Sequence, residues 1–127
     1  MKKKTLLAID DDELILRLIR DVGQDAGYEV VTVQDANYLN TALDENEPVL
    51  IILDLVMPQF DGVEVLRTLA DRGSAVRLLM ISGFDTTLLA RAKKLAEVWG
   101  LDVVGSVEKP LDVEKLSLAF KQIQALS

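Results

Sequence analysis

Residues 49–54 read Val-Leu-Ile-Ile-Leu-Asp, so that the apolar run 49–53 ends directly in a carboxylate. The run is too short for a typical helix, and its continuous rather than alternating apolar pattern favours a strand covered on both faces. Four similar runs occur at 5–9, 29–33, 76–81 and 103–107. Because strands of this kind are typical of parallel sheets, the five runs together predict one parallel sheet.

The segments between these runs have the apolar spacing of helices. They lie at 15–26, 37–44, 63–70, 86–99 and 113–123. Asp12 is a suitable N-cap for the first helix and Asp112 for the last, which we expect to bury Val113, Leu116, Phe120 and Ile123. A strand and a helix alternating five times predict a doubly wound α/β fold of the flavodoxin type, with helices on both faces of the sheet and strand order 2-1-3-4-5.

The composition of the 127-residue chain narrows the chemistry that it can perform. The chain has no cysteine and no histidine, which excludes disulfides, thiolate zinc sites and the commonest general base. Its net charge of −7 argues against direct nucleic-acid binding, because basic patches supply that affinity. No run approaches the roughly 20 apolar residues that span a bilayer, so we expect a cytoplasmic protein without membrane contact.

Acidic residues follow two strands that this fold would make neighbours. Asp10 and Asp11 come directly after the first strand, and Asp54 follows the third. A single acid in such a position is often only a turn residue or a helix cap. Three carboxylates crowded together destabilise the fold unless a cation joins them, and Mg²⁺ suits a ligand set made of oxygen atoms. The sequence therefore predicts a magnesium site at the carboxyl edge of the sheet.

A hydroxyl and an ammonium group follow the other two strands at this edge. Ser82 and Gly83 end the fourth strand, and Glu108-Lys109-Pro110 follows the fifth. Each taken alone fits an ordinary turn or a solvated lysine. The Lys109–Pro110 bond is a candidate for a cis peptide, which would direct Lys109 back over the carboxylates. Carboxylate, cation, hydroxyl and ammonium together predict phosphoryl transfer to Asp54 as the nucleophile.

Taken together, these segments resemble the response-regulator receiver domain of bacterial two-component signalling. The resemblance is carried by Ile9-Asp10-Asp11-Asp12, Leu53-Asp54-Leu55-Val56-Met57-Pro58 with Asp61-Gly62, Ile81-Ser82-Gly83 and Glu108-Lys109-Pro110. It extends from about Lys4 to Ile123. We therefore expect residues 1–127 to be a single receiver domain, with a core at about 4–123 and no output domain.

The resemblance implies that Asp54 accepts a phosphoryl group from a phosphohistidine on a sensor histidine kinase or a phosphotransfer protein. It also implies that Asp11, Asp54 and the backbone carbonyl of Val56 bind Mg²⁺, with Asp10 acting through water. By the same resemblance, the chain is a signalling phosphoacceptor that catalyses only its own phosphorylation and dephosphorylation.

One position departs from the family's pattern and bears on how the signal is relayed. The resemblance implies that Ser82 and Lys109 hold the phosphoryl oxygens. Receivers commonly carry Tyr or Phe three residues before this lysine, and here the position is Ser106. We therefore expect Gly83 and Phe84, which follow the hydroxyl, to carry the change instead.

The resemblance further implies an output domain or effector protein that binds the face of the fourth helix, fifth strand and fifth helix, and a homodimer formed on phosphorylation. Arg91, Lys93 and Lys94 form a basic patch on that fourth helix, although a solvated helix face also explains them.

Three other functions fit parts of the sequence. An aspartyl-nucleophile phosphohydrolase would need a second acid two residues after Asp54, where this chain has Val56. A nucleotide-binding module would need a glycine-rich first turn, whereas the turn here is Asp-Asp-Asp-Glu. A receiver fold used as a phosphorylation-independent interaction domain usually lacks one of the site residues, and none is missing here.

Overall fold

In the computed structural model, which describes residues 3–57 and 61–126, five parallel strands form one sheet in the order β2-β1-β3-β4-β5. The strands are β1 (Thr5–Ile9), β2 (Glu29–Val33), β3 (Leu50–Asp54), β4 (Arg77–Ser82) and β5 (Asp102–Glu108). The doubly wound fold and the strand order 2-1-3-4-5 are therefore confirmed. Pro58, which belongs to one of the motifs above, lies outside the described residues.

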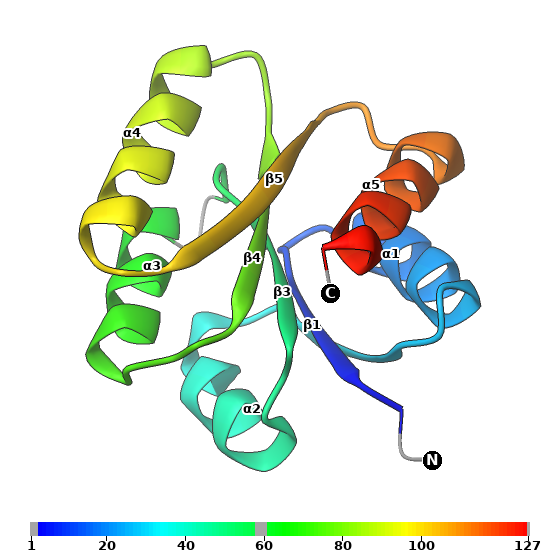
Figure 1. Cartoon of the computed structure of the whole chain (residues 1–127), viewed down its shortest axis with the longest axis horizontal. Helices are drawn as coiled ribbons and strands as arrows, with labels where there is room; N and C mark the ends of the chain where they lie inside the picture. Colours follow the sequence, from blue (N-terminus) through cyan, green and yellow to red (C-terminus); the bar gives the residue numbers. More distant parts are fainter. Residues whose placement is uncertain (1–2, 58–60, 127) are drawn as a thin grey trace.

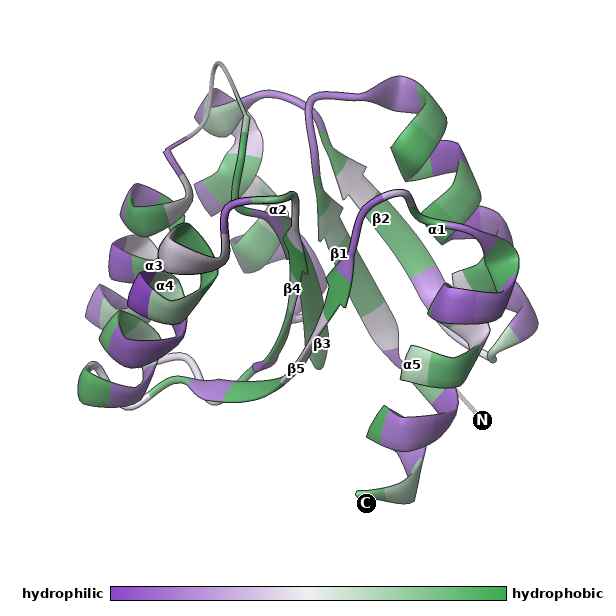
Figure 2. Cartoon of the chain, turned by 90° about the horizontal axis from the view of Figure 1, so that it is seen from above, coloured by the Kyte–Doolittle hydropathy of each residue, from purple (hydrophilic) through white to green (hydrophobic). Residues whose placement is uncertain are grey.

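Helices cover both faces of this sheet (Figure 1). On one face lie α1 (Glu13–Asp25) and α5 (Val113–Ala125), and on the other lie α2 (Leu39–Asn46), α3 (Gly62–Asp71) and α4 (Thr86–Val98). Each face buries its own cluster of apolar side chains against the sheet. Figure 2 shows the same division, with apolar strands in the middle and polar residues on the outer sides of the helices.

The three central strands and the two edge strands are buried to different extents. All five residues of β3 are buried, whereas only Val33 of β2 and Val107 of β5 are. The expectation that all five apolar runs are covered on both faces is therefore wrong for β2 and β5. Each of these strands has a neighbour on one side only, and the helices cover the middle of the sheet more completely than its edges.

Two helix caps are at the predicted residues, but the burial of one side chain and the extent of one helix differ from the prediction. Asp12 caps α1 by accepting the N–H of Leu14, and Asp112 caps α5 by accepting the N–H of Lys115. Val113 is 57% exposed rather than buried, because side chains tilt toward the N-terminus of a helix and the first one points past its end. The helix expected over 37–44 is a short 3₁₀ turn (Ala36–Tyr38) followed by α2.

The carboxyl ends of the parallel strands meet at one edge of the sheet, where ligands bind in folds of this kind. Within 3–57 and 61–126, no helix is both long enough and apolar enough to span a membrane.

Candidate functional site

Three carboxylates converge at the carboxyl edge of the sheet. Asp10 and Asp11 follow β1, Asp54 ends β3, and the two strands are paired so that Ile9 lies beside Leu53. One oxygen of each carboxylate lies within 4.8 Å of the other two. Asp10 and Asp54 are fully buried and Asp11 is half-buried. The sequence-based prediction that these acids cluster is confirmed.

Backbone N–H groups use one oxygen of each buried carboxylate. Asp10 Oδ1 accepts the N–H of Asp12, and Asp54 Oδ1 accepts that of Val56, both over 2.9 Å. Each acid thereby shapes the loop that follows its own strand. The second oxygen of Asp10, Oδ2, is buried and has no hydrogen-bond partner among the described residues.

Burial makes the Asp10 carboxyl an unusually weak acid. Desolvation raises its pKa from 3.8 to about 7, and the nearby charge of Asp54 acts in the same direction. The hydrogen bond from the Asp12 N–H and the charge of Lys109 oppose this rise in pKa without cancelling it. Ionised Asp10 is therefore costly to the folded protein unless a further positive charge is close.

Lys109 extends over the carboxylates from the loop after β5. Its Nζ donates to Asp54 Oδ2 over 2.6 Å, and its backbone N–H donates to the carbonyl of Ser82 over 2.8 Å. The Lys109–Pro110 bond is cis, as the sequence suggested. Burial by itself would lower the pKa of Lys109, but the hydrogen bond and charge of Asp54, together with the charges of Asp10 and Asp11, raise it overall. The lysine therefore stays charged beside Asp54.

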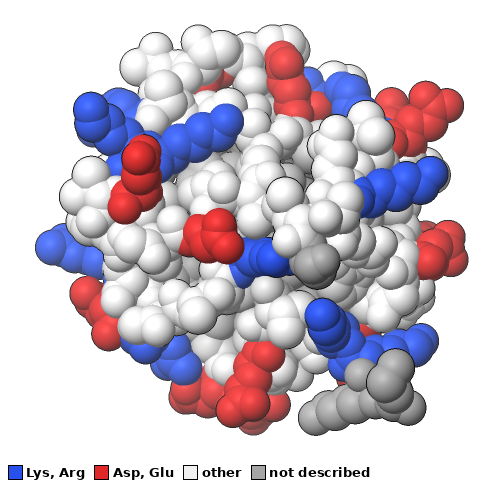
Figure 3. Space-filling view, viewed as in Figure 1, with Lys and Arg blue, Asp and Glu red and all other residues white. Residues whose placement is uncertain are grey.

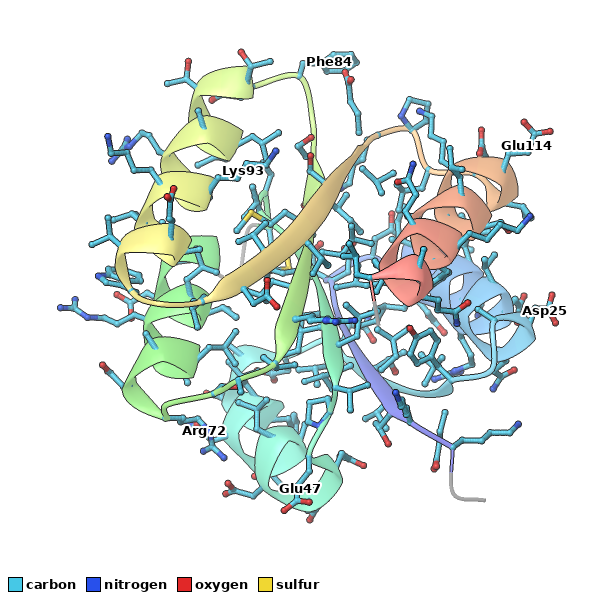
Figure 4. The ribbon with its side chains drawn as sticks, in the orientation of Figure 1. Asp25, Glu47, Arg72, Phe84, Lys93 and Glu114 are labelled. Carbon is cyan, nitrogen blue, oxygen red and sulfur yellow. The ribbon has the colours of Figure 1, made fainter. Side chains whose placement is uncertain are left out.

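The fourth strand brings its hydroxyl residue to the same edge. Ser82 ends β4 and is buried, one residue beyond Ile81, which is paired with Asp54. Gly83 follows it and is half-buried, and a side chain at Gly83 would meet nothing within 4 Å. Phe84 comes next, is 90% exposed and points away from the fold (Figure 4).

The loop after β3 is shaped by a short antiparallel bridge between Val56 and Asp61. Asp61 caps α3 by accepting the N–H of Val63. A Cβ on Gly62 would lie 3.3 Å from both the Cα and the carbonyl oxygen of Leu55, so only glycine fits here without a shift. Val56 is held beside Asp54 by these contacts, and its side chain is 53% exposed.

Ser106 does not lie at the cluster. It is an exposed residue of the edge strand β5, paired with Met80, and the β4–β5 register shifts just before it, between Leu78 and Leu79. A groove of about 440 Å³ runs between α4 and β5 on this side of the sheet, past Lys93 and Gly105.

Two polar contacts beside the site were not anticipated. Gln34 Nε2 donates to the backbone carbonyl of Asp11 over 3.2 Å. Lys115, in the first turn of α5, donates to the carbonyls of Glu108 and Pro110. No local motif marks Gln34. Lys115 could have been noticed, because a positive charge in the first turn of a helix opposes the helix dipole.

The residues present fit a hard divalent cation. The donors are all oxygen atoms, three of them carboxylates, and the unpaired buried Oδ2 of Asp10 belongs to the same cluster. Mg²⁺ binds through few carboxylates and keeps several waters, which agrees with this donor set.

Comparisons with known proteins all indicate the same family. The family pattern described as "Response regulator receiver domain" matches residues 6–121. The chain is 30% identical over 117 residues to "Response regulator receiver protein CpdR" of Brucella abortus, covering 86% of this chain and 97% of that protein. It is 27% identical to "Alkaline phosphatase synthesis transcriptional regulatory protein PhoP" of Bacillus subtilis, covering 94% of this chain but 48% of that protein.

Solved structures agree with the family match. A response regulator from Colwellia psychrerythraea superimposes with a TM-score of 0.85 at 32% identity, covering 99% of this chain and 100% of that one. The Vibrio cholerae chemotaxis protein CheY4 gives 0.79 at 26% identity, covering 99% and 100%. Of the first curated relatives, this chain spans only 28% to 48% of the length.

Proposed function

Because the chain belongs to the response regulator receiver domain family of two-component signalling, we propose that Asp54 is its phosphoacceptor. The observation that carries this proposal is the contact of Lys109 Nζ with Asp54 Oδ2, 2.6 Å long, inside a cluster of three carboxylates. An oxygen of Asp54 attacks the phosphorus of a phosphohistidine on a kinase or phosphotransfer protein. The new P–O bond forms as the P–N bond breaks, and the imidazole leaves with the electron pair.

Asp11, Asp54 and the backbone carbonyl of Val56 would hold Mg²⁺, with Asp10 contributing through water. Bound there, the metal ion would neutralise charge on the phosphoryl oxygens. Asp10 supports this assignment, since its buried Oδ2 lacks a partner among the described residues and its pKa is raised to about 7.

Ser82 and Lys109 would then hold the phosphoryl oxygens. The Lys109 ammonium already contacts Asp54, so it needs only to transfer its hydrogen bond from the carboxylate to the new phosphoryl group. Because the Lys109 side chain is already ordered beside Asp54, it loses little further conformational entropy when the phosphoryl donor arrives. This lowers the free energy of the transition state. The protein would thus catalyse its own phosphorylation and dephosphorylation.

The signal would leave through the face formed by α4, β5 and α5. Arg91, Lys93 and Lys94 supply the basic side chains of α4, and the space-filling view shows blue side chains at the upper left, where α4 lies, beside a red one (Figure 3). Lys93 reaches from α4 toward β5, where it borders the groove (Figure 4). With Ser106 exposed, the segment of Gly83 and Phe84 would carry the change to α4.

The partner on this face would be an output domain or an effector protein, or a second copy of the chain after phosphorylation. Two of the relatives are named transcriptional regulatory proteins, which supports an output of that class. A cytoplasmic location follows from a donor of the histidine kinase type and is proposed on that ground.

The mass of the intact protein tests the assignment. Incubation with a small acyl phosphate and Mg²⁺ should add one phosphoryl group to the wild type and none to Asp54→Asn. The control Asp71→Asn removes an exposed acid from the end of α3 and should label like the wild type. Equal labelling of Asp54→Asn would overturn the assignment, and an unlabelled wild type would favour a phosphorylation-independent interaction domain.

A further inference from the structure

Lys115 ties together the carbonyl groups of the two residues on either side of Lys109. Its Nζ donates to the carbonyl of Glu108 over 3.1 Å and to that of Pro110 over 2.9 Å. The two acceptors are the residues directly before and after Lys109 in the chain. One ammonium group therefore spans the short loop that carries the lysine of the site.

The position of Lys115 in its helix is locally unfavourable. It is the third residue of α5, where the helix dipole favours an acid such as its neighbour Glu114, labelled in Figure 4. Two carbonyl acceptors compensate the ammonium, and hydrogen bonds that involve a charged group are stronger than neutral ones. The backbone N–H of Lys115 is also held, by Asp112 over 2.8 Å. A residue that departs from a local rule and gains specific contacts indicates a role beyond helix formation.

Three attachments then define where Lys109 lies. Its N–H donates to the carbonyl of Ser82, its Nζ donates to Asp54, and the carbonyls of the residues before and after it accept from Lys115. The first two lead to the sheet and the third leads to α5. Without the Lys115 ammonium, these two carbonyls lose their side-chain donor from α5, and the placement of Lys109 Nζ depends on its contacts with the sheet.

We infer that Lys115 is a positioning residue for the phosphoryl-transfer site, which holds the loop 108–110 so that Lys109 Nζ stays over Asp54. This inference rests on the proposed function, because it assigns Lys115 a role through Lys109. Misplacement of a reacting or stabilising group by about 1 Å can cost about a hundredfold in rate. Loosening the loop at one of its three attachments should lower the rate by a smaller factor.

The test uses single-turnover phosphorylation of the full chain with a small acyl phosphate at saturating Mg²⁺. Lys115→Met keeps the aliphatic stem and removes the donors, and should lower the rate about tenfold. Lys115→Arg keeps a charge and several donors, and should restore most of the rate. The matched control Lys121→Met removes an exposed lysine from the same helix and should react like the wild type.

A double-mutant comparison separates positioning from a general structural effect. Lys109→Gln alone should slow the reaction, and adding Lys115→Met to it should have no further effect, because the two residues act as one unit. The Kd for Mg²⁺ should be the same in Lys115→Met and in the wild type, since its carboxylate ligands follow β1 and β3. A wild-type rate for Lys115→Met, or the same fold loss in both backgrounds, overturns the inference.

Amide exchange tests the placement without phosphoryl transfer. The N–H of Lys109 should exchange faster in Lys115→Met than in Lys121→Met, and equal exchange overturns the inference. Failure of the proposed function would show instead in a wild type that is not labelled on Asp54.

Discussion

Lys109 Nζ lies 2.6 Å from Asp54 Oδ2, and the two side chains differ sharply in exposure, at 32% and 1%. The pair joins the loop after β5 to the end of β3, 55 positions apart in the chain. Since Asp54 is buried next to Asp10, the ammonium is the nearest compensation for two carboxylates that water does not reach.

Removing this ammonium should destabilise the folded protein. Lys109→Met leaves the buried Asp54 carboxylate without its charged partner, a loss worth about 2 kcal/mol of the free energy of unfolding. Adding Asp54→Asn should recover much of that loss, because it removes the uncompensated charge. Urea unfolding of the single and double variants measures both effects. The control Lys94→Met, on the exposed side of α4, should leave the midpoint unchanged, and strictly additive effects at 54 and 109 would contradict the expectation.

Mg²⁺ should stabilise the protein through the acidic cluster. A ligand that binds only the folded state adds about 2.7 kcal/mol at a hundredfold excess over its Kd. The Tm should therefore rise with Mg²⁺ and fall with EDTA, and Asp11→Ala should lose most of this response while Asp71→Asn keeps it. A Tm indifferent to both Mg²⁺ and EDTA would contradict the metal site.

The pH dependence of stability should reveal the buried Asp10. Its pKa is raised to about 7 in the folded state, so the folded protein keeps a proton that the unfolded chain loses near 3.8. The free energy of unfolding should then fall as the pH rises from about 4 to 7, at about 1.4 kcal/mol per pH unit, and level off above that. Lys109, whose pKa is raised, stays charged throughout this range and contributes no slope.

Chemical unfolding in EDTA at several pH values measures this slope. Asp10→Asn cannot ionise and should flatten the profile between pH 5 and 7. Saturating Mg²⁺ should also reduce the slope in the wild type, because a cation favours the ionised carboxylate. A wild-type profile as flat as that of Asp10→Asn would refute the raised pKa of Asp10.

The phosphorylated form should be long-lived. Hydrolysis needs a water in line with the departing bond. Val56, two residues after Asp54, and Phe84, two residues after Ser82, have no side-chain group that can hydrogen-bond to such a water. Val56→Asn combined with Phe84→Glu should speed dephosphorylation about tenfold, which corresponds to about 1.4 kcal/mol off the barrier. Loss of the phosphoryl mass with time measures the rate. Decay of the double variant at the wild-type rate would show that these residues do not control the water.

The sequence alone was sufficient for the sheet and for the gathering of the acids. Apolar runs mark strands and their spacing marks helices because both patterns arise within one element. The strand–helix alternation then restricts the topology, since right-handed crossovers bring the carboxyl ends of parallel strands to one edge. The position of Asp10, Asp11 and Asp54 at the ends of neighbouring strands is therefore enough to place the three carboxylates together.

Only the tertiary structure decided which groups are left without partners and which contacts hold the loops. The unpaired Oδ2 of Asp10 and the hydrogen bonds of Lys115 to Glu108 and Pro110 have no local signature. Each depends on where a side chain meets another element, and that is set by the packing of helices against the sheet. The same limit explains why β2 and β5 were expected to be covered, since an apolar run records the preference of a strand but not its place at the edge of the sheet.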